Sequence, residues 1–182
     1  MSDARDGSSM DRLSDRMRIV DLTLRMIEHV DLLQWDRLHS CFTEDLSVNY
    51  SYVLGNGLTE LTAEEFIEQW QRTLGGFEAT QHMVTNHRVA FEDSEGMTGD
   101  TARCTAYFQA QHFYPDDCGG SIWTLGGHYD FETVREDDGW RISELAMTGL
   151  WATGNQHLLQ IAADRSVGSS TRFELGDRDG LE

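Results

Sequence analysis

The stretch TARCTAYFQAQHFY, residues 101–114, alternates between two sets of side chains. One set reads Ala102, Cys104, Ala106, Phe108, Ala110 and His112, and the other reads Arg103, Thr105, Tyr107, Gln109, Gln111 and Phe113. A period of two predicts a β-strand with one apolar, buried face and one more polar face. Because the pattern runs so far along the chain, it favours a long, strongly curved antiparallel sheet.

Helices are expected before this sheet. Apolar residues recur at three- and four-residue steps in the first part of the chain, at Leu13, Met17, Val20, Leu24 and Ile27, which predicts an amphipathic helix with that set facing the core. A short helix is expected at 36–42, a third after the capping-box spacing of Thr62 and Glu65, and a closing helix at 155–165.

Turn sequences divide the rest into strands. We expect strands near 45–53, 78–92, 100–114, 121–135 and 139–152, with EDSEG, YPDDCGG and REDDG between several of them. Helices followed by long strands predict an α+β fold in which the helices cover one face of the sheet. We expect one domain at 10–165, between flexible tails at 1–9 and 166–182.

Composition limits the possible partners. The 182 residues carry a formal net charge of −18, and every basic residue is an arginine. Such a charge opposes binding to nucleic acid and to anionic lipid, so we expect neither partner. Three cysteines without CxxC spacing, no apolar leader and no apolar run of about 18 residues favour a reduced, cytoplasmic protein that does not cross a membrane.

Three polar residues stand where apolar ones are expected. The helical stripe continues to Asp31, the apolar face of 101–114 ends at His112, and the alternating set Leu46 and Val48 continues to Tyr50. A buried carboxylate needs a partner or a raised pKa. Each residue also has an ordinary structural explanation: Asp31 as a cap after a frayed helix, His112 as a backbone-bonded histidine, and Tyr50 as core packing.

The segment TQHMVTNHRV, residues 80–89, leaves a question open. Its alternating sets are His82, Val84, Asn86 and Arg88 against Met83, Thr85, His87 and Val89, and neither set is cleanly apolar. A bulge or a pocket would explain the ambiguity equally well.

Several motifs together resemble a known family. MIEHVDLLQWDRLHSCFTEDLSVNYSYV, LTAEEFIEQW, ATQHMVTNHRV, AYFQAQHFY and DDGWRI, over roughly residues 13–152, are similar to the scytalone dehydratase-like branch of the SnoaL/NTF2-like superfamily. The resemblance implies a cone-shaped NTF2-like fold with N-terminal helices on a mixed, mostly antiparallel, strongly curved sheet. It also implies a homo-oligomer, a trimer or a dimer. The same fold serves enzymes and non-catalytic proteins, so it does not by itself imply a function.

The resemblance also implies site residues. Local alignment places the family's catalytic aspartate, two histidines and one tyrosine at Asp31, His82, His112 and Tyr50. The family's second tyrosine is Val30 here, so the water that polarises the carbonyl in the family loses one of its two partners. The family's pocket asparagine falls on Tyr129, and Asn86 is at best a local substitute.

The implied reaction is removal of water next to a carbonyl of a cyclic, polyketide- or steroid-like molecule, with no cofactor or metal. His82 would act as the base, Asp31 would hydrogen-bond to one of the two histidines, and Tyr50 would donate to the enolate oxygen. Phe108, Trp123 and Trp151 are expected as apolar walls. The alternatives are a polyketide cyclase or isomerase with the same Asp/His pair, a His-His-Asp metal site, and a non-catalytic ligand-binding protein.

Overall fold

The computed structural model describes residues 3–50, 57–92, 100–115 and 120–166, with side chains described from residue 10 onward. In chain order the elements are α1 (Asp3–Asp31), α2 (Trp35–Leu38), the 3-10 helix η1 (His39–Cys41), β1 (Phe42–Asn49), β2 (Thr59–Thr62), α4 (Ala63–Leu74), β3 (Ala79–Phe91), β4 (Thr101–Phe113), β5 (Ile122–Glu136), β6 (Gly139–Gly154) and α5 (Leu158–Ser166).

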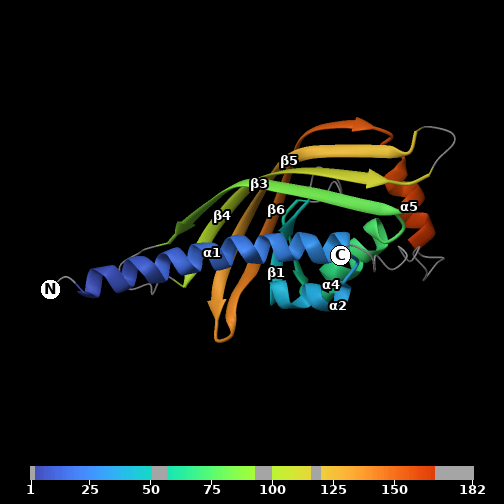
Figure 1. The fold of residues 1–182 in the computed structure, drawn as a ribbon. Helices are drawn as coiled ribbons and strands as arrows, with labels where there is room; N and C mark the ends of the chain where they lie inside the picture. The colour runs from blue at the N-terminus through green and yellow to red at the C-terminus, as the bar shows by residue number, and fades with distance from the viewer. Residues whose placement is uncertain (1–2, 51–56, 93–99, 116–119, 167–182) are drawn as a thin grey trace, which may run out of the picture.

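The six strands form one sheet in the order β2-β1-β6-β5-β4-β3. The pairing of β1 with β6 is parallel, and the other pairings are antiparallel. The long strands bend, α1 crosses one face of the sheet, and α2, α4 and α5 gather near the C-terminal end of α1 (Figure 1). The expected α+β architecture of helices on a mixed, mostly antiparallel sheet is therefore confirmed.

The boundaries differ from expectation at several points. The short strand β2, which pairs with β1, was not predicted, because four residues are too few to show a period. Helix α1 begins at Asp3, so residues 3–9, expected as part of a flexible tail, are helical. Of the expected tails, residues 1–2 and 167–182 lie outside the described residues.

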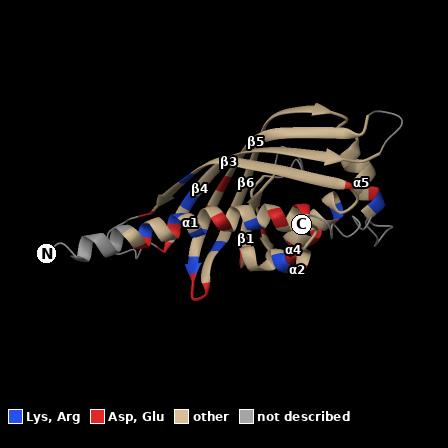
Figure 2. Ribbon diagram, viewed as in Figure 1, with Lys and Arg blue, Asp and Glu red and all other residues tan. Residues whose placement is uncertain are grey.

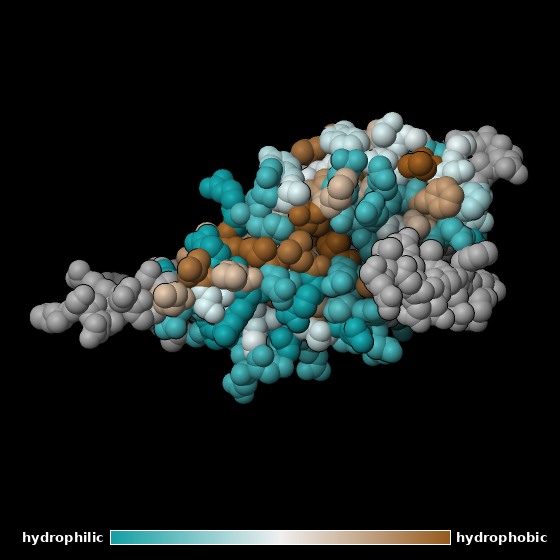
Figure 3. Space-filling model, in the orientation of Figure 1, coloured by the Kyte–Doolittle hydropathy of each residue, from teal (hydrophilic) through white to brown (hydrophobic). Residues whose placement is uncertain are grey.

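The buried face of α1 matches only part of the set that the periodicity predicted: Ile27 is buried and Val20 is half-buried. Leu13, Met17 and Leu24 are 53%, 66% and 43% exposed, whereas Ile19 and Leu22 are fully buried. Two apolar stripes run along the helix, about a third of a turn apart at roughly 100° per residue, and spacing alone does not show which one meets the sheet. Apolar surface consequently remains visible along α1 (Figure 3).

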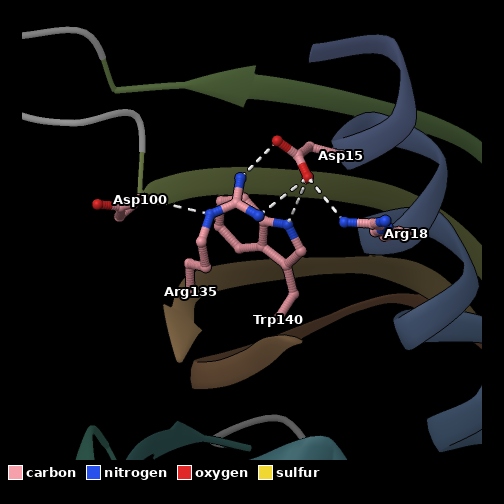
Figure 4. A network of polar contacts seen from close by, with 5 residues as sticks. All are labelled: Asp15, Arg18, Asp100, Arg135 and Trp140. Atoms are coloured by element: carbon pink, nitrogen blue, oxygen red, sulfur yellow. Dashed lines mark hydrogen bonds and ion pairs between the residues drawn. The ribbon is translucent and has the colours of Figure 1, made fainter. Parts of the chain in front are cut away.

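A polar cluster fixes the N-terminal half of α1 to the hairpin of β5 and β6 (Figure 4). The guanidinium of Arg135 donates through both terminal nitrogens to Asp15, and through Nε to Asp100 at 3.1 Å. The indole N–H of Trp140 also donates to Asp15, at 3.3 Å, and the Arg135 guanidinium lies 4.5 Å from the Trp140 ring centroid. The hydrogen bonds from Arg135 are the main reason that the pKa of Asp15 is lowered.

A bulge in β3 answers the question that TQHMVTNHRV raised. The register with β4 shifts between Thr85 and Arg88, and Asn86 has a φ of 59°. Asparagine tolerates this left-handed conformation better than most residues. The extra residue reverses the alternation, so that His82 faces inward before the bulge and Val89 faces inward after it.

Close contact between the backbone at Gly76 and helix α5 places α5 over one end of the fold. A Cβ at Gly76, just after α4, would lie 1.8 Å from the backbone oxygen of Ala162 in α5. Only glycine allows this approach, which brings Leu158 and Ala162 into the core. None of the helices in the described ranges is long and apolar enough to cross a membrane.

Candidate active site

A carboxylate at the end of α1 meets a histidine on β3. Asp31 accepts a 2.7 Å hydrogen bond from Nδ1 of His82 and a 2.8 Å bond from the His82 backbone N–H, and the Thr80 hydroxyl donates to it at 2.9 Å. The side chain of Asp31 is only 18% exposed, and that of His82 only 7%. Burial raises the pKa of Asp31, but the hydrogen bonds and charge of His82 outweigh it, so the pKa is lowered.

The ionised carboxylate determines which nitrogen of His82 is free. Because an ionised carboxylate can only accept hydrogen bonds, neutral His82 carries its proton on Nδ1. Nε2 is then the ring nitrogen left for a ligand, with its lone pair available to take a proton. This carboxylate–imidazole arrangement fixes the ring and stabilises the imidazolium that would form.

The second histidine, His112 on β4, lies beside the first but has a different character. Its ring centroid is 5.6 Å from that of His82 and 4.7 Å from that of Trp123. Burial lowers the pKa of His112 to about 3, helped by the neighbouring His82, while the Trp123 backbone and Asp31 act in the opposite direction. His112 is therefore neutral at pH 7 and suits a hydrogen-bonding role better than that of a base.

Two tyrosines complete the polar side of the site. Tyr50, just after β1, and Tyr129 on β5 are almost fully buried. Burial, together with Tyr129 close by, holds the pKa of Tyr50 well above its ordinary range, and burial also raises the pKa of Tyr129. Both phenols keep their protons at neutral pH and can donate hydrogen bonds. Phe108 stacks on Tyr129 with ring centroids 4.4 Å apart.

These residues line one cavity with a volume of about 60 Å³. Its lining comprises Ile27, Val30, Tyr50, Trp70, Thr73, Leu74, His82, Phe108, Ala110, His112, Trp123, Leu125, Tyr129, Met147 and Leu159. Small-molecule sites usually enclose roughly 300–1,000 Å³. A ring-sized ligand therefore requires the cavity to widen.

The structure brings most of the predicted site residues together. His82, His112, Tyr50, Phe108, Trp123 and Tyr129 all line the cavity, and Asp31 lies directly behind His82. Asp31 was expected to hydrogen-bond either His82 or His112, and in the structure it bonds His82.

Two predicted substrate-binding residues are not part of the cavity. Asn86 is exposed at the β3 bulge, and Trp151 is 46% exposed with its indole over Gly126. The bulge at Asn86 and the register shift at Gly126 and Gly127 alter the simple alternation on which those placements depended.

Thr80 is a site residue that the sequence patterns did not predict. It is buried and donates to Asp31. Its position two residues before His82, and so on the same strand face, was the available signal. Within the described ranges no group of three or more His, Cys, Asp or Glu side chains is arranged to hold a metal ion.

Comparisons with known proteins identify relatives of this chain. A family model for the SnoaL-like domain matches residues 11–146. The uncharacterized protein Rv2910c of Mycobacterium tuberculosis is 32% identical over 136 residues, which cover 74% of this chain and 84% of the relative. The expected SnoaL-like, NTF2-like relationship is confirmed.

Solved structures show the same fold. Protein Kfla4162 of Kribbella flavida aligns with a TM-score of 0.75 at 28% identity, over 82% of this chain and 99% of its own. A Novosphingobium aromaticivorans protein provisionally assigned as a scytalone dehydratase aligns with a TM-score of 0.69 at 19% identity, over 81% and 92%. A type 2 hexachlorocyclohexane dehydrochlorinase (LinA) aligns with a TM-score of 0.67 at 20% identity, over 95% and 99%.

Proposed function

This chain belongs to the SnoaL-like domain family, and from that premise we propose that it is a cofactor-independent lyase acting on a small cyclic molecule. The reaction is removal of water next to a carbonyl, with His82 as the base. The observation that carries the proposal is the Asp31–His82 pair on the wall of a largely apolar cavity. Similarity in fold to proteins named as a dehydrochlorinase and, provisionally, a dehydratase supports elimination chemistry.

The proposed steps balance with the residues present. Nε2 of His82 takes the proton on the carbon next to the carbonyl, and the electron pair forms an enolate. Tyr50 donates a hydrogen bond to the enolate oxygen. The enolate collapses to a conjugated double bond as hydroxide leaves from the β-carbon, and the His82 imidazolium returns a proton to form water. Asp31 stabilises the imidazolium throughout.

The presence of Val30 in place of the family tyrosine fits a direct hydrogen bond from Tyr50 to the substrate carbonyl. Val30 is 1% exposed and lines the cavity, so it provides apolar surface where the family has a hydroxyl. Tyr50 is then the donor for the carbonyl. The cavity volume of about 60 Å³ favours a single-ring substrate over a steroid or a multi-ring polyketide.

Proton abstraction can be tested without knowing the natural substrate. Cyclohexanone in deuterated buffer should exchange its α-protons faster with the protein than without it, as measured by NMR, and 3-hydroxycyclohexanone should yield the enone. His82→Ala should reduce both rates by about 10²–10⁴-fold. His39→Ala, a change at an exposed histidine outside the cavity, is the matched control.

The outcomes separate the candidate functions. Exchange without loss of water would favour an isomerase or cyclase that uses the same pair. No exchange with any cyclic ketone, in a protein that still binds them, would favour a ligand-binding role. A cytoplasmic location and a homo-oligomeric state stay predictions.

A further inference from the structure

Unpaired buried polar atoms concentrate around this cavity. In the described parts of the chain, five buried side-chain nitrogen or oxygen atoms have no hydrogen-bond partner. Three of them belong to cavity residues: Trp123 Nε1, His112 Nδ1 and Tyr50 Oη, whose contact with the neighbouring Tyr129 phenol falls outside hydrogen-bond geometry. An unpaired buried polar group costs free energy, so such groups normally have partners, and three around one cavity point to a ligand that supplies them.

Of the three unpaired groups, the indole N–H of Trp123 is the most restrictive in the hydrogen-bond partner that it accepts. An indole N–H can only donate, whereas a hydroxyl or a neutral imidazole can also accept. Trp123 is 2% exposed, so bulk water does not satisfy its N–H. A ligand that pairs this group must present an acceptor atom, such as a carbonyl or hydroxyl oxygen.

The position of Trp123 relative to the base is set by strand register. Trp123 on β5 pairs directly with His112 on β4, and His112 in turn lies next to His82 on β3. The three rings therefore form a row across three neighbouring strands.

Charge excludes anionic ligands from the same place. Among the residues that the structure describes, no arginine lines the cavity, and lysine is absent from the whole sequence. The carboxylate of Asp31, which is bonded to the cavity residue His82, would repel an anion. The described charged residues are prominent on α1 and at the β5–β6 turn, while much of the sheet in view is uncharged (Figure 2). Transferring a carboxylate into this apolar space without a cation would be costly.

We propose that Trp123 is a specificity-determining residue whose indole N–H, together with the Tyr50 hydroxyl, binds the acceptor oxygen of an uncharged ligand. The site then selects neutral cyclic molecules that carry a carbonyl or hydroxyl oxygen, and rejects both carboxylates and plain hydrocarbons. Calling this ligand the substrate rests on the proposed lyase function, but the binding preference does not.

The test is ligand binding observed at the indole itself. The protein labelled with ¹⁵N at its tryptophan side chains is titrated with cyclohexanone, cyclohexanecarboxylate and methylcyclohexane, three probes of one ring size. Cyclohexanone should move the Trp123 N–H resonance downfield in a saturable way. The carboxylate should leave the resonance in place, and methylcyclohexane should bind more weakly than the ketone without the downfield shift.

Variants assign the resonance and the affinity. Trp123→Phe should remove the shifting signal and weaken cyclohexanone binding roughly three- to tenfold, the effect of one net hydrogen bond. Tyr50→Phe, which keeps the ring, should weaken binding by a similar factor and so gives a second test if Trp123→Phe does not fold. Trp151→Phe alters an indole outside the cavity and should leave the affinity unchanged.

Opposite results would overturn the inference. Equal binding of the carboxylate would show that charge does not select the ligand. Saturable ketone binding with a stationary Trp123 resonance would show that the indole only packs. A Trp123 shift without α-proton exchange would leave the inference standing and count against the lyase, whereas exchange dependent on His82 with a stationary Trp123 resonance would do the reverse.

Discussion

The carboxylate of Asp31 and the imidazole of His82 lie 2.7 Å apart, although 51 residues separate them in the chain. Asp31 occupies the last position of α1, and His82 lies near the start of β3. Contact between the helix and the edge strand of the sheet thus assembles the central pair of the proposed site. This pair, not either residue alone, provides an oriented base.

Replacing Asp31 by asparagine should remove that orientation. In the native protein the neutral His82 ring should carry its proton on Nδ1, which ¹⁵N NMR of the histidine rings can show. In Asp31→Asn the amide cannot reproduce all three acceptor bonds, so we expect a mixture of tautomers and about a 10²-fold or greater loss of α-proton exchange. An unchanged tautomer together with a full exchange rate would contradict the role assigned to Asp31.

Acid should destabilise the fold through His112. Its pKa of about 3 in the folded protein lies below the ordinary 6.5, so between these values the unfolded chain binds more protons and stability falls as pH falls. From pH 7 to pH 5 this effect amounts to about 2 kcal/mol. Urea unfolding at both pH values should show a correspondingly smaller loss for His112→Phe.

His87 provides a check on that measurement. Burial lowers the pKa of His87 too, so its contribution has the same sign, but it is present in both proteins and cancels in the comparison. Parallel pH profiles for the native protein and His112→Phe would show that His112 is not buried in the neutral form.

Removing the Tyr50 hydroxyl should stabilise the ligand-free protein. The hydroxyl is buried, and its contact with the neighbouring Tyr129 phenol falls outside hydrogen-bond geometry; a group left unsatisfied in this way costs about 1–3 kcal/mol. Tyr50→Phe should therefore raise the free energy of unfolding by about 1 kcal/mol while weakening ketone binding. Tyr107→Phe, at a 54% exposed position on the opposite face of β4, should change neither, and clear destabilisation by Tyr50→Phe would reveal a bonded hydroxyl.

The cluster around Asp15 should hold α1 in place. Asp15→Asn weakens the paired bonds from Arg135 and leaves that guanidinium with Asp100 as its remaining carboxylate partner, which should cost about 2 kcal/mol. Amide hydrogen exchange should accelerate mainly in the N-terminal half of α1. Asp21→Asn disrupts an exposed pair with Arg25 on the same helix and should cost less than about 0.5 kcal/mol; equal effects would exclude a special role for Asp15.

Sequence patterns predicted most elements because their local signals are strong. The alternation of 101–114 and the capping box of α4 both appear in the structure, where Thr62 and Glu65 bond reciprocally. The predicted buried stripe of α1 was wrong at Leu13, Met17 and Leu24, because these residues follow the same spacing as the buried ones. Which side of a helix faces solvent depends on what packs against the other side. The spacing of apolar residues carries no information about that packing partner.

For the site, the sequence by itself determined which chemical groups are available: a carboxylate ending a helix, two histidines on neighbouring strands, a tyrosine after a strand, and a composition without lysine. Only the tertiary structure decided that Asp31 bonds His82, that the β3 bulge turns His87 and Val89 inward, and that Asn86 and Trp151 stay outside the cavity. The physical reason is that one extra residue in a strand reverses every later side chain. Hydrogen-bond partners far apart in the chain are likewise chosen by packing, not by local preference.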